Sequence, residues 1–164
     1  MKRILICYYT ETFSTKEVCD NIADTLGTEN EVTIKELKEV DNLSNFDTIV
    51  IAAPIHGMRW HQSANDFVLT HKQVLKDKEI VYIALASMAY QGYHFWQKKI
   101  YNALEKPSKI VKPIETAVFG GLSGDMPSFF SLIFGVPKDA KADQRDWNMI
   151  KEWNINLLKQ IKKS

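Results

Sequence analysis

Four hydroxyl side chains follow the first apolar run of the chain within one short turn. The run, 4–9, does not alternate between polar and apolar positions, which is typical of a strand buried on both faces. The hydroxyls belong to Thr10, Thr12, Ser14 and Thr15, and an amphipathic helix is predicted from about Lys16. Backbone N–H groups at the start of a helix lack intrahelical acceptors and carry partial positive charge. Together with the hydroxyls they could hold a phosphate, although helix capping alone would favour the same residue types.

The charge of this turn limits the kind of phosphate that it suits. No lysine or arginine precedes Lys16 in the turn, and neither G-x-x-x-x-G-K-[S/T] nor G-x-G-x-x-G occurs in the chain. Those two motifs are the common fingerprints of triphosphate and dinucleotide sites. The sequence therefore favours a phosphate that is bound by neutral donors.

Apolar runs and amphipathic stretches alternate along the whole chain. We predict strands at 4–9, 31–37, 47–55, 79–86 and 114–119, and helices at 16–26, 62–75, 93–104 and 146–161. This alternation predicts a doubly wound α/β fold with a five-stranded parallel sheet in the order 2-1-3-4-5. In such a sheet ligands bind beyond the carboxyl ends of the strands. Three loops are expected to converge there: 10–15, 54–62 and 87–92.

Composition excludes several classes of protein. The 164 residues are enough for one domain, 45% are hydrophobic and 25% are charged, and the formal net charge of +1 gives no drive toward nucleic acid. No apolar run is long enough to span a membrane, and Met1-Lys2-Arg3 lacks the shape of a signal peptide. Cys7 and Cys19 are too few for a disulfide framework and fit a core, so we expect a cytoplasmic protein.

The first turn resembles the FMN-phosphate loop of flavodoxins, with its T-x-T-x-x-T spacing of hydroxyls. The resemblance rests on Ile6-Cys7-Tyr8-Tyr9 followed by Thr10-Glu11-Thr12-Phe13-Ser14-Thr15. It implies that FMN is the cofactor and that the six residues from Thr10 to Thr15 bind its phosphate. Phe13 departs from the family, which usually has a small residue there, often glycine.

The second and third loops offer groups suited to a flavin ring. The expected cofactor contacts are Pro54, Ile55, His56, Gly57, Met58 and Arg59, then Ser87, Met88, Ala89, Tyr90 and Gly92. Met58 and Trp60 could cover the ring, and Gly57 could let its peptide reorient toward the flavin N5. Arg59 or His56 could balance negative charge on the ring. We also place Trp60 facing the substrate; the alternative is a surface loop with Trp60 packed beneath the next helix.

The stretch 122–145 is longer than a connection within a compact domain needs, which favours a functional role. Its apolar residues are Met126, Phe129, Phe130, Leu132, Ile133, Phe134 and Val136. We expect Phe129, Phe130 and Phe134 to face a substrate. A membrane-surface contact and a homodimer face are alternatives, and so is a short helix that covers the edge of the sheet.

A narrower resemblance covers nearly the whole chain. Three stretches, 54–67, 119–121 and 143–147, resemble the menaquinone-dependent protoporphyrinogen dehydrogenases of the flavodoxin-domain group. In that family a flavin passes electrons from a porphyrinogen to a membrane quinone. The resemblance thus implies an FMN-dependent oxidoreductase of heme biosynthesis with a quinone or porphyrinogen substrate, peripheral membrane contact and no bound metal.

Two other interpretations remain open. As a flavodoxin-type protein, the chain would shuttle electrons between redox protein partners; such shuttles are typically strongly acidic, whereas this chain is balanced. As a non-redox protein, it would keep the fold without the flavin, and Phe13 favours that reading. The enzyme is the interpretation that the charge and the apolar stretch 122–145 favour.

Overall fold

A parallel sheet forms the centre of the molecule. The computed structural model describes residues 1–87, 90, 93–122, 133, 135 and 142–163. The parallel strands are β1 (Arg3–Tyr8), β2 (Glu31–Glu36), β3 (Thr48–His56), β5 (Glu79–Ala86) and β6 (Glu115–Gly120), and they lie in the order β2-β1-β3-β5-β6. The two-residue strand β4 (Arg59–Trp60) pairs antiparallel with the end of β3. Counted without β4, this is the predicted order 2-1-3-4-5.

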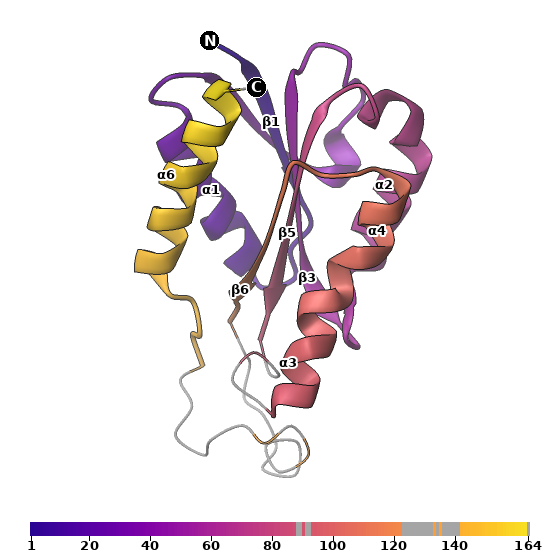
Figure 1. The fold of residues 1–164 in the computed structure, drawn as a ribbon, viewed down its shortest axis with the longest axis vertical. Helices are drawn as coiled ribbons and strands as arrows, with labels where there is room; N and C mark the ends of the chain where they lie inside the picture. The colour runs from indigo at the N-terminus through magenta and orange to yellow at the C-terminus, as the bar shows by residue number, and fades with distance from the viewer. Residues whose placement is uncertain (88–89, 91–92, 123–132, 134, 136–141, 164) are drawn as a thin grey trace.

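Helices cover both faces of the sheet (Figure 1). On one face lie α1 (Ser14–Leu26) and α6 (Trp147–Lys163); on the other lie α2 (Gln62–Leu75), α3 (His94–Tyr101) and α4 (Glu105–Ile110). Two short 3-10 helices, Leu37–Glu39 and Asn102–Leu104, complete the described elements. The predicted helix 93–104 ends early and continues through a 3-10 turn into α4, which the sequence analysis did not anticipate. No described helix is long and apolar enough to cross a bilayer.

The continuous apolar runs are explained by two cores, one on each face. Alternate residues of β1 point to opposite sides: Ile4 and Ile6 pack with α1 and α6, and Leu5 and Cys7 pack on the α2 side. All four are completely buried. A strand with apolar contacts on both faces shows no period of two, as the sequence indicated. Cys7 and Cys19 are free, buried thiols, as expected of core residues.

The chain returns to the sheet by a close backbone approach after β6. A Cβ on Gly120 would lie 1.9 Å from the carbonyl oxygen of Gln144, so only glycine fits there. Next to this contact, Leu122 and Asp143 form an antiparallel bridge, and the Gln144 N–H donates to the Gly121 carbonyl at 3.0 Å. The two ends of the predicted insert are therefore fixed side by side at the carboxyl edge of the sheet.

Candidate functional site

The turn after β1 holds buried hydroxyls at the start of α1. Ser14 and Thr15 are 6% and 1% exposed, and the hydroxyls of Thr12 and Ser14 lie 3.1 Å apart. The hydroxyl oxygen of Thr10 is buried without a hydrogen-bond partner. A buried polar atom without a partner destabilises a protein unless something else binds it. The turn therefore has an unmet capacity for hydrogen bonding at the end of β1.

Phe13 occupies the N-cap position of α1 in the left-handed region, with φ of 62°. Its carbonyl accepts the first helical N–H, from Glu17, at 3.0 Å. A bulky side chain is rare in this region, where glycine is favoured. The Phe13 side chain is 69% exposed, so the ring does not fill the turn. The departure from the flavodoxin pattern thus strains the backbone locally without placing the ring in the core.

A tight hairpin joins β3 to β4. His56 pairs with Arg59, which leaves Gly57 and Met58 as a two-residue loop with φ of 55° and 62°. Positive φ at both central residues is the requirement of a type I′ turn. A Cβ on Gly57 would meet no atom within 4 Å, so the demand for glycine comes from the backbone angle alone. Met58 satisfies the same demand with a side chain that packs near Ala86.

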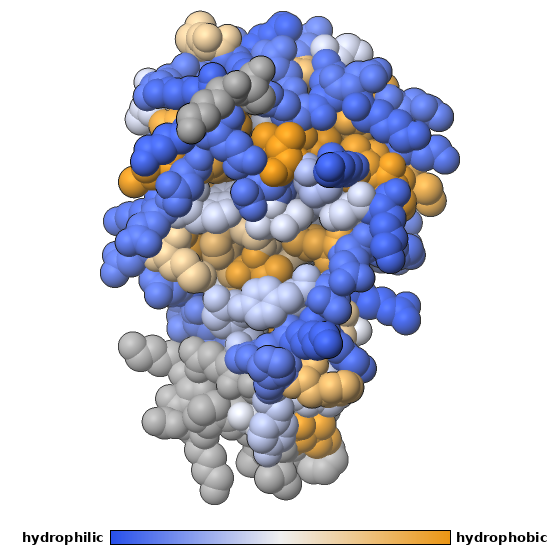
Figure 2. Space-filling view, in the orientation of Figure 1, coloured by the Kyte–Doolittle hydropathy of each residue, from blue (hydrophilic) through white to orange (hydrophobic). Residues whose placement is uncertain are grey.

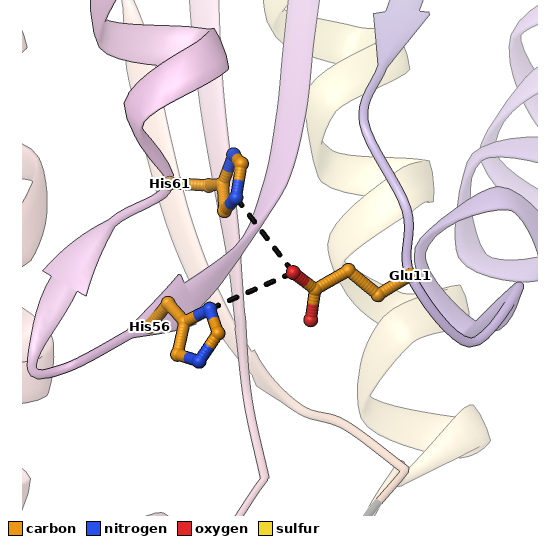
Figure 3. A group of neighbouring side chains, drawn as sticks. All are labelled: Glu11, His56 and His61. Carbon is orange, nitrogen blue, oxygen red and sulfur yellow. Dashed lines mark ion pairs between the residues drawn. The ribbon is translucent and has the colours of Figure 1, made fainter.

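The first turn and the hairpin meet through three ionisable side chains (Figure 3). The Glu11 Oε1 atom lies 3.5 Å from His56 Nδ1 and 3.7 Å from His61 Nε2. His61 is held from its other side by Tyr9, whose ring stacks on the imidazole with centroids 4.0 Å apart. His56 and Glu11 are exposed, whereas the His61 side chain is 17% exposed. The Glu11 carboxylate therefore joins two loops that are far apart in the sequence.

The hydrogen bond of His61 determines which of its nitrogens carries the proton. His61 caps α2: its Nδ1 accepts the Ser63 N–H at 3.2 Å, so the proton of a neutral ring is on Nε2, toward Glu11. Burial lowers the pKa of His61; Glu11 opposes this shift and His56 adds to it. The three side chains are close enough together for a cation. A metal-binding histidine, however, normally donates its second ring N–H, which His61 cannot do here.

Arg145 links the connection between β6 and α6 to α1. Its guanidinium donates to Asp143 Oδ1 and Oδ2 at 2.8 and 2.7 Å, and it also binds Glu17 in the first turn of α1. These hydrogen bonds hold the pKa of Asp143 below its ordinary value. The Arg145 side chain is 7% exposed and lies over the Trp147 ring. The segment that leads into α6 is therefore fixed beside the turn 10–15.

The third loop is described at Ser87 and Tyr90. Ser87 is half-buried, and Tyr90 packs against the buried residues Ala86 and Ile100. Burial raises the pKa of the Tyr90 hydroxyl. Its backbone carbonyl accepts from the Gln97 side chain at 3.1 Å, which fixes the loop to α3. Tyr90 thus combines a half-buried side chain with a position at the carboxyl edge of the sheet.

The arrangement of loops agrees with a known family. A family model described as "Flavodoxin domain" matches residues 5–131. The chain belongs to the flavodoxin domain family. The order of the strands agrees with this family, and so does the meeting of the first and second loops at the switch point between β1 and β3. Among curated protein sequences, none matches the chain.

Solved flavodoxins share the fold at low sequence identity. Flavodoxin 2 from Bacillus cereus is 17% identical with a TM-score of 0.65, covering 96% of this chain and 99% of that one. The Fusobacterium nucleatum flavodoxin bound to flavin mononucleotide is 18% identical with a TM-score of 0.58, covering 99% and 98%. The rubredoxin oxygen:oxidoreductase of Desulfovibrio gigas is 11% identical with a TM-score of 0.62, covering 99% of this chain and 36% of that one. Nothing in these matches points to the protoporphyrinogen dehydrogenases in particular.

Trp60, a predicted site residue of this flavodoxin domain, lies in the core. Trp60 is 1% exposed, its indole N–H donates to the Ile83 carbonyl at 3.0 Å, and its ring packs on Tyr82. The prediction that Trp60 faces a substrate is therefore wrong, because its side chain lies in the core on the α2 side of the sheet. Successive side chains of a strand point to opposite faces, so in β4 the Trp60 side chain points inward while Arg59 is exposed. Pro54 and Ile55 are half-buried at the end of β3.

Several predicted residues lie outside the described part of the chain. They are Met88, Ala89, Gly92, Phe129, Phe130 and Phe134. Their assignment to the cofactor or to a substrate stays a prediction, as does the contact of the first turn with a phosphate.

Sequence reasoning missed the side chains that connect the loops. Tyr9 was assigned to the strand, and neither His61 nor Arg145 was given a role. His61 precedes an amphipathic helix and so could have been tested as an N-cap, although histidine is not a preferred residue there. Arg145 binds Glu17, which is 128 residues away, and no sequence pattern indicates this pairing.

Proposed function

We propose that this flavodoxin domain binds FMN at the carboxyl edge of the sheet and transfers electrons through it. The observation that carries the proposal is the orphaned Thr10 hydroxyl in a turn of hydroxyls at the start of α1. A phosphate oxygen supplies the acceptor that this hydroxyl lacks, and free N–H groups at the helix start add to the binding. The Fusobacterium nucleatum flavodoxin, which has the same fold, is bound to flavin mononucleotide.

Charge around the turn fits a phosphate held by neutral donors. Lys16 is engaged by Asp20 at 2.7 Å and Glu17 by Arg145, so neither is free to dominate the site. Glu11 would repel a phosphate, but its carboxylate faces the two histidines of the second loop. The His61 Nε2–H partly offsets that negative charge.

The proposed roles of the remaining residues follow from where they lie. When bound, FMN supplies the redox chemistry. Met58 and Tyr90, both packed near Ala86, would shield one side of the ring from water. The hairpin at Gly57 would offer backbone groups to the ring edge, since glycine adopts either peptide orientation at low free energy. His61 would hold a proton near the ring edge.

Identification of the cofactor tests the proposal directly. Protein purified without added flavin should show flavin absorption, and mass spectrometry of the released cofactor should show FMN. FAD as the sole cofactor, or apoprotein that fails to take up FMN in a fluorescence titration, would contradict it. The titration also gives the affinity with which the variants discussed below can be compared.

Oxidation of a porphyrinogen with a quinone as acceptor is a second candidate function. It is favoured by the apolar composition of 122–145, by the narrower sequence resemblance and by the balanced charge of +1, which is unlike an acidic shuttle. The two functions differ in their acceptors. An enzyme should turn over protoporphyrinogen with a menaquinone analogue, whereas a shuttle should pass electrons to a redox protein and be inactive with the porphyrinogen.

A further inference from the structure

α3 and the residue before it carry exposed aromatic rings next to lysines. Tyr93, Phe95 and Tyr101 are 57%, 60% and 56% exposed. Lys98 and Lys99 are exposed three and four positions after Phe95, so they lie on the same side of the helix. The Lys99 ammonium lies over the Phe95 ring, 4.7 Å from its centroid. Figure 2 shows hydrophobic residues at this end of the molecule, bordered by strongly hydrophilic ones.

Positive charge is concentrated in the segment that contains α3 and α4. The segment 93–112 contains one acidic residue, Glu105, and five exposed lysines: Lys98, Lys99, Lys106, Lys109 and Lys112. Its net charge is +4 with histidine neutral, whereas that of the whole chain is +1, so the rest of the protein is net negative. The net charge of the whole chain is therefore close to zero although the segment along α3 and α4 is basic.

We infer that α3 docks the protein onto an anionic phospholipid membrane. Lysines attract the negative surface of a bilayer, and Tyr and Phe rings enter its interfacial layer with their apolar parts. On α3 the exposed Lys98 and Lys99 lie one turn after the exposed Phe95 ring, on the same side of the helix. A protein partner would instead be expected to bury such rings in matching pockets.

The placement of α3 gives the docking a use. The helix follows the third loop, and Tyr90 of that loop is tied to α3 through the Gln97 side chain. α3 therefore lies at the carboxyl edge of the sheet, the edge that carries the candidate site (Figure 1). Docking through α3 would bring this edge close to the lipid. The inference does not depend on FMN, because every residue that carries it lies outside the cofactor-binding turn.

Co-sedimentation of the full-length protein with vesicles tests the docking. We expect binding to vesicles of equal phosphatidylglycerol and phosphatidylcholine, little binding to pure phosphatidylcholine, and loss of binding at high salt. Lys98→Glu/Lys99→Glu should weaken partitioning at least about 25-fold, at roughly fivefold for each lysine lost near the surface. Phe95→Ser, at an exposed position, should weaken it severalfold with the fold intact.

A matched stripe on α6 supplies the control. Ile155 is 48% exposed and lies between the exposed residues Lys151 and Lys159 at helical spacing, on the other face of the sheet. Lys151→Glu/Lys159→Glu and Ile155→Ser should leave vesicle binding nearly unchanged. Equal losses from the α6 variants, or no binding of the native protein to the anionic vesicles, would overturn the inference. Capture by polyaspartate beads without vesicle binding would also overturn it, because it would indicate an acidic protein partner.

Flavin content, measured by absorption in the same samples, separates this inference from the proposed function. Apoprotein and FMN-loaded protein should sediment alike. A protein without flavin that still binds the vesicles would contradict the cofactor proposal and leave the docking surface intact.

Discussion

Two loops at the carboxyl edge of the sheet, the turn 10–15 after β1 and the return of the chain after β6, are held in place by different kinds of interaction. The turn 10–15 is local: it needs hydroxyls, a helix start and one residue with positive φ, all within six positions. The return after β6 is nonlocal. It needs the contact between Gly120 and Gln144 and the ion pair that ties Arg145 to Glu17, residues far apart in the sequence. We propose that the local turn binds a ligand, whereas the nonlocal return holds the chain in place.

This difference implies that substitutions in the two loops have different effects. Changes in the return should lower the free energy of unfolding, whereas changes in the turn should alter binding while the fold survives. Arg145 joins the two loops, since it links the last connection to the helix that begins in the turn. The substitutions below test how far the separation holds.

Gly120→Ala should have the largest effect. The new Cβ would lie 1.9 Å from the Gln144 carbonyl oxygen, so the backbone of one segment must move. We expect a loss of about 3 kcal/mol in the free energy of unfolding, measured with urea. Gly121→Ala is the matched control, because its nearest atom would be at an ordinary 3.5 Å. Similar losses in both variants would show that the close approach is not the cause.

Thr10→Val should weaken binding without lowering stability. Valine keeps the branched shape and removes the buried hydroxyl that has no partner. Affinity for FMN should fall by about 5- to 150-fold, equivalent to about 1–3 kcal/mol, while the apoprotein becomes no less stable. Fluorescence titration and urea unfolding of the same samples measure both quantities. Thr28→Val, which removes an exposed hydroxyl bonded to the Thr25 carbonyl, should leave the affinity unchanged.

The sequence predicts the sheet well because its signals are local. The runs 4–9, 47–55 and 79–86 are apolar on both faces, and β1, β3 and β5 lie there with limits shifted by a residue or so. Trp60 was misplaced because a strand of only two residues decides which way it points, and that strand exists only by pairing with β3. The meeting of Glu11 with His61 likewise depends on the order of the strands, so the residue types alone did not reveal it.

Phe13→Gly should stabilise the apoprotein slightly. The exposed ring contributes little packing, and glycine removes the penalty of a left-handed backbone. After the extra entropy of an unfolded glycine is subtracted, about 0.5–1 kcal/mol should remain. Gly57→Ala is the reverse experiment, since its Cβ would meet no atom within 4 Å and only the positive φ opposes it. It should destabilise by about 1 kcal/mol. If Phe13→Gly destabilised instead, the ring would have to be part of the structure of the turn.

His61→Asn should have the smallest effect, seen only in the dependence of stability on pH. Because burial lowers the pKa of His61, the folded state binds fewer protons than the unfolded state as the pH falls through about 6.5. His61 therefore contributes stability above that pH and loses it below, and protonation of Nδ1 also ends the cap on Ser63. Asparagine is a good N-cap that does not titrate here, so the variant should lose less stability than the native protein between pH 8 and pH 5.

Urea unfolding at the two pH values measures the difference, with His94→Asn, at an exposed histidine that opens α3, as the control. Identical pH profiles for the native protein and His61→Asn would contradict this prediction, because they would mean that His61 binds protons equally in the folded and unfolded states.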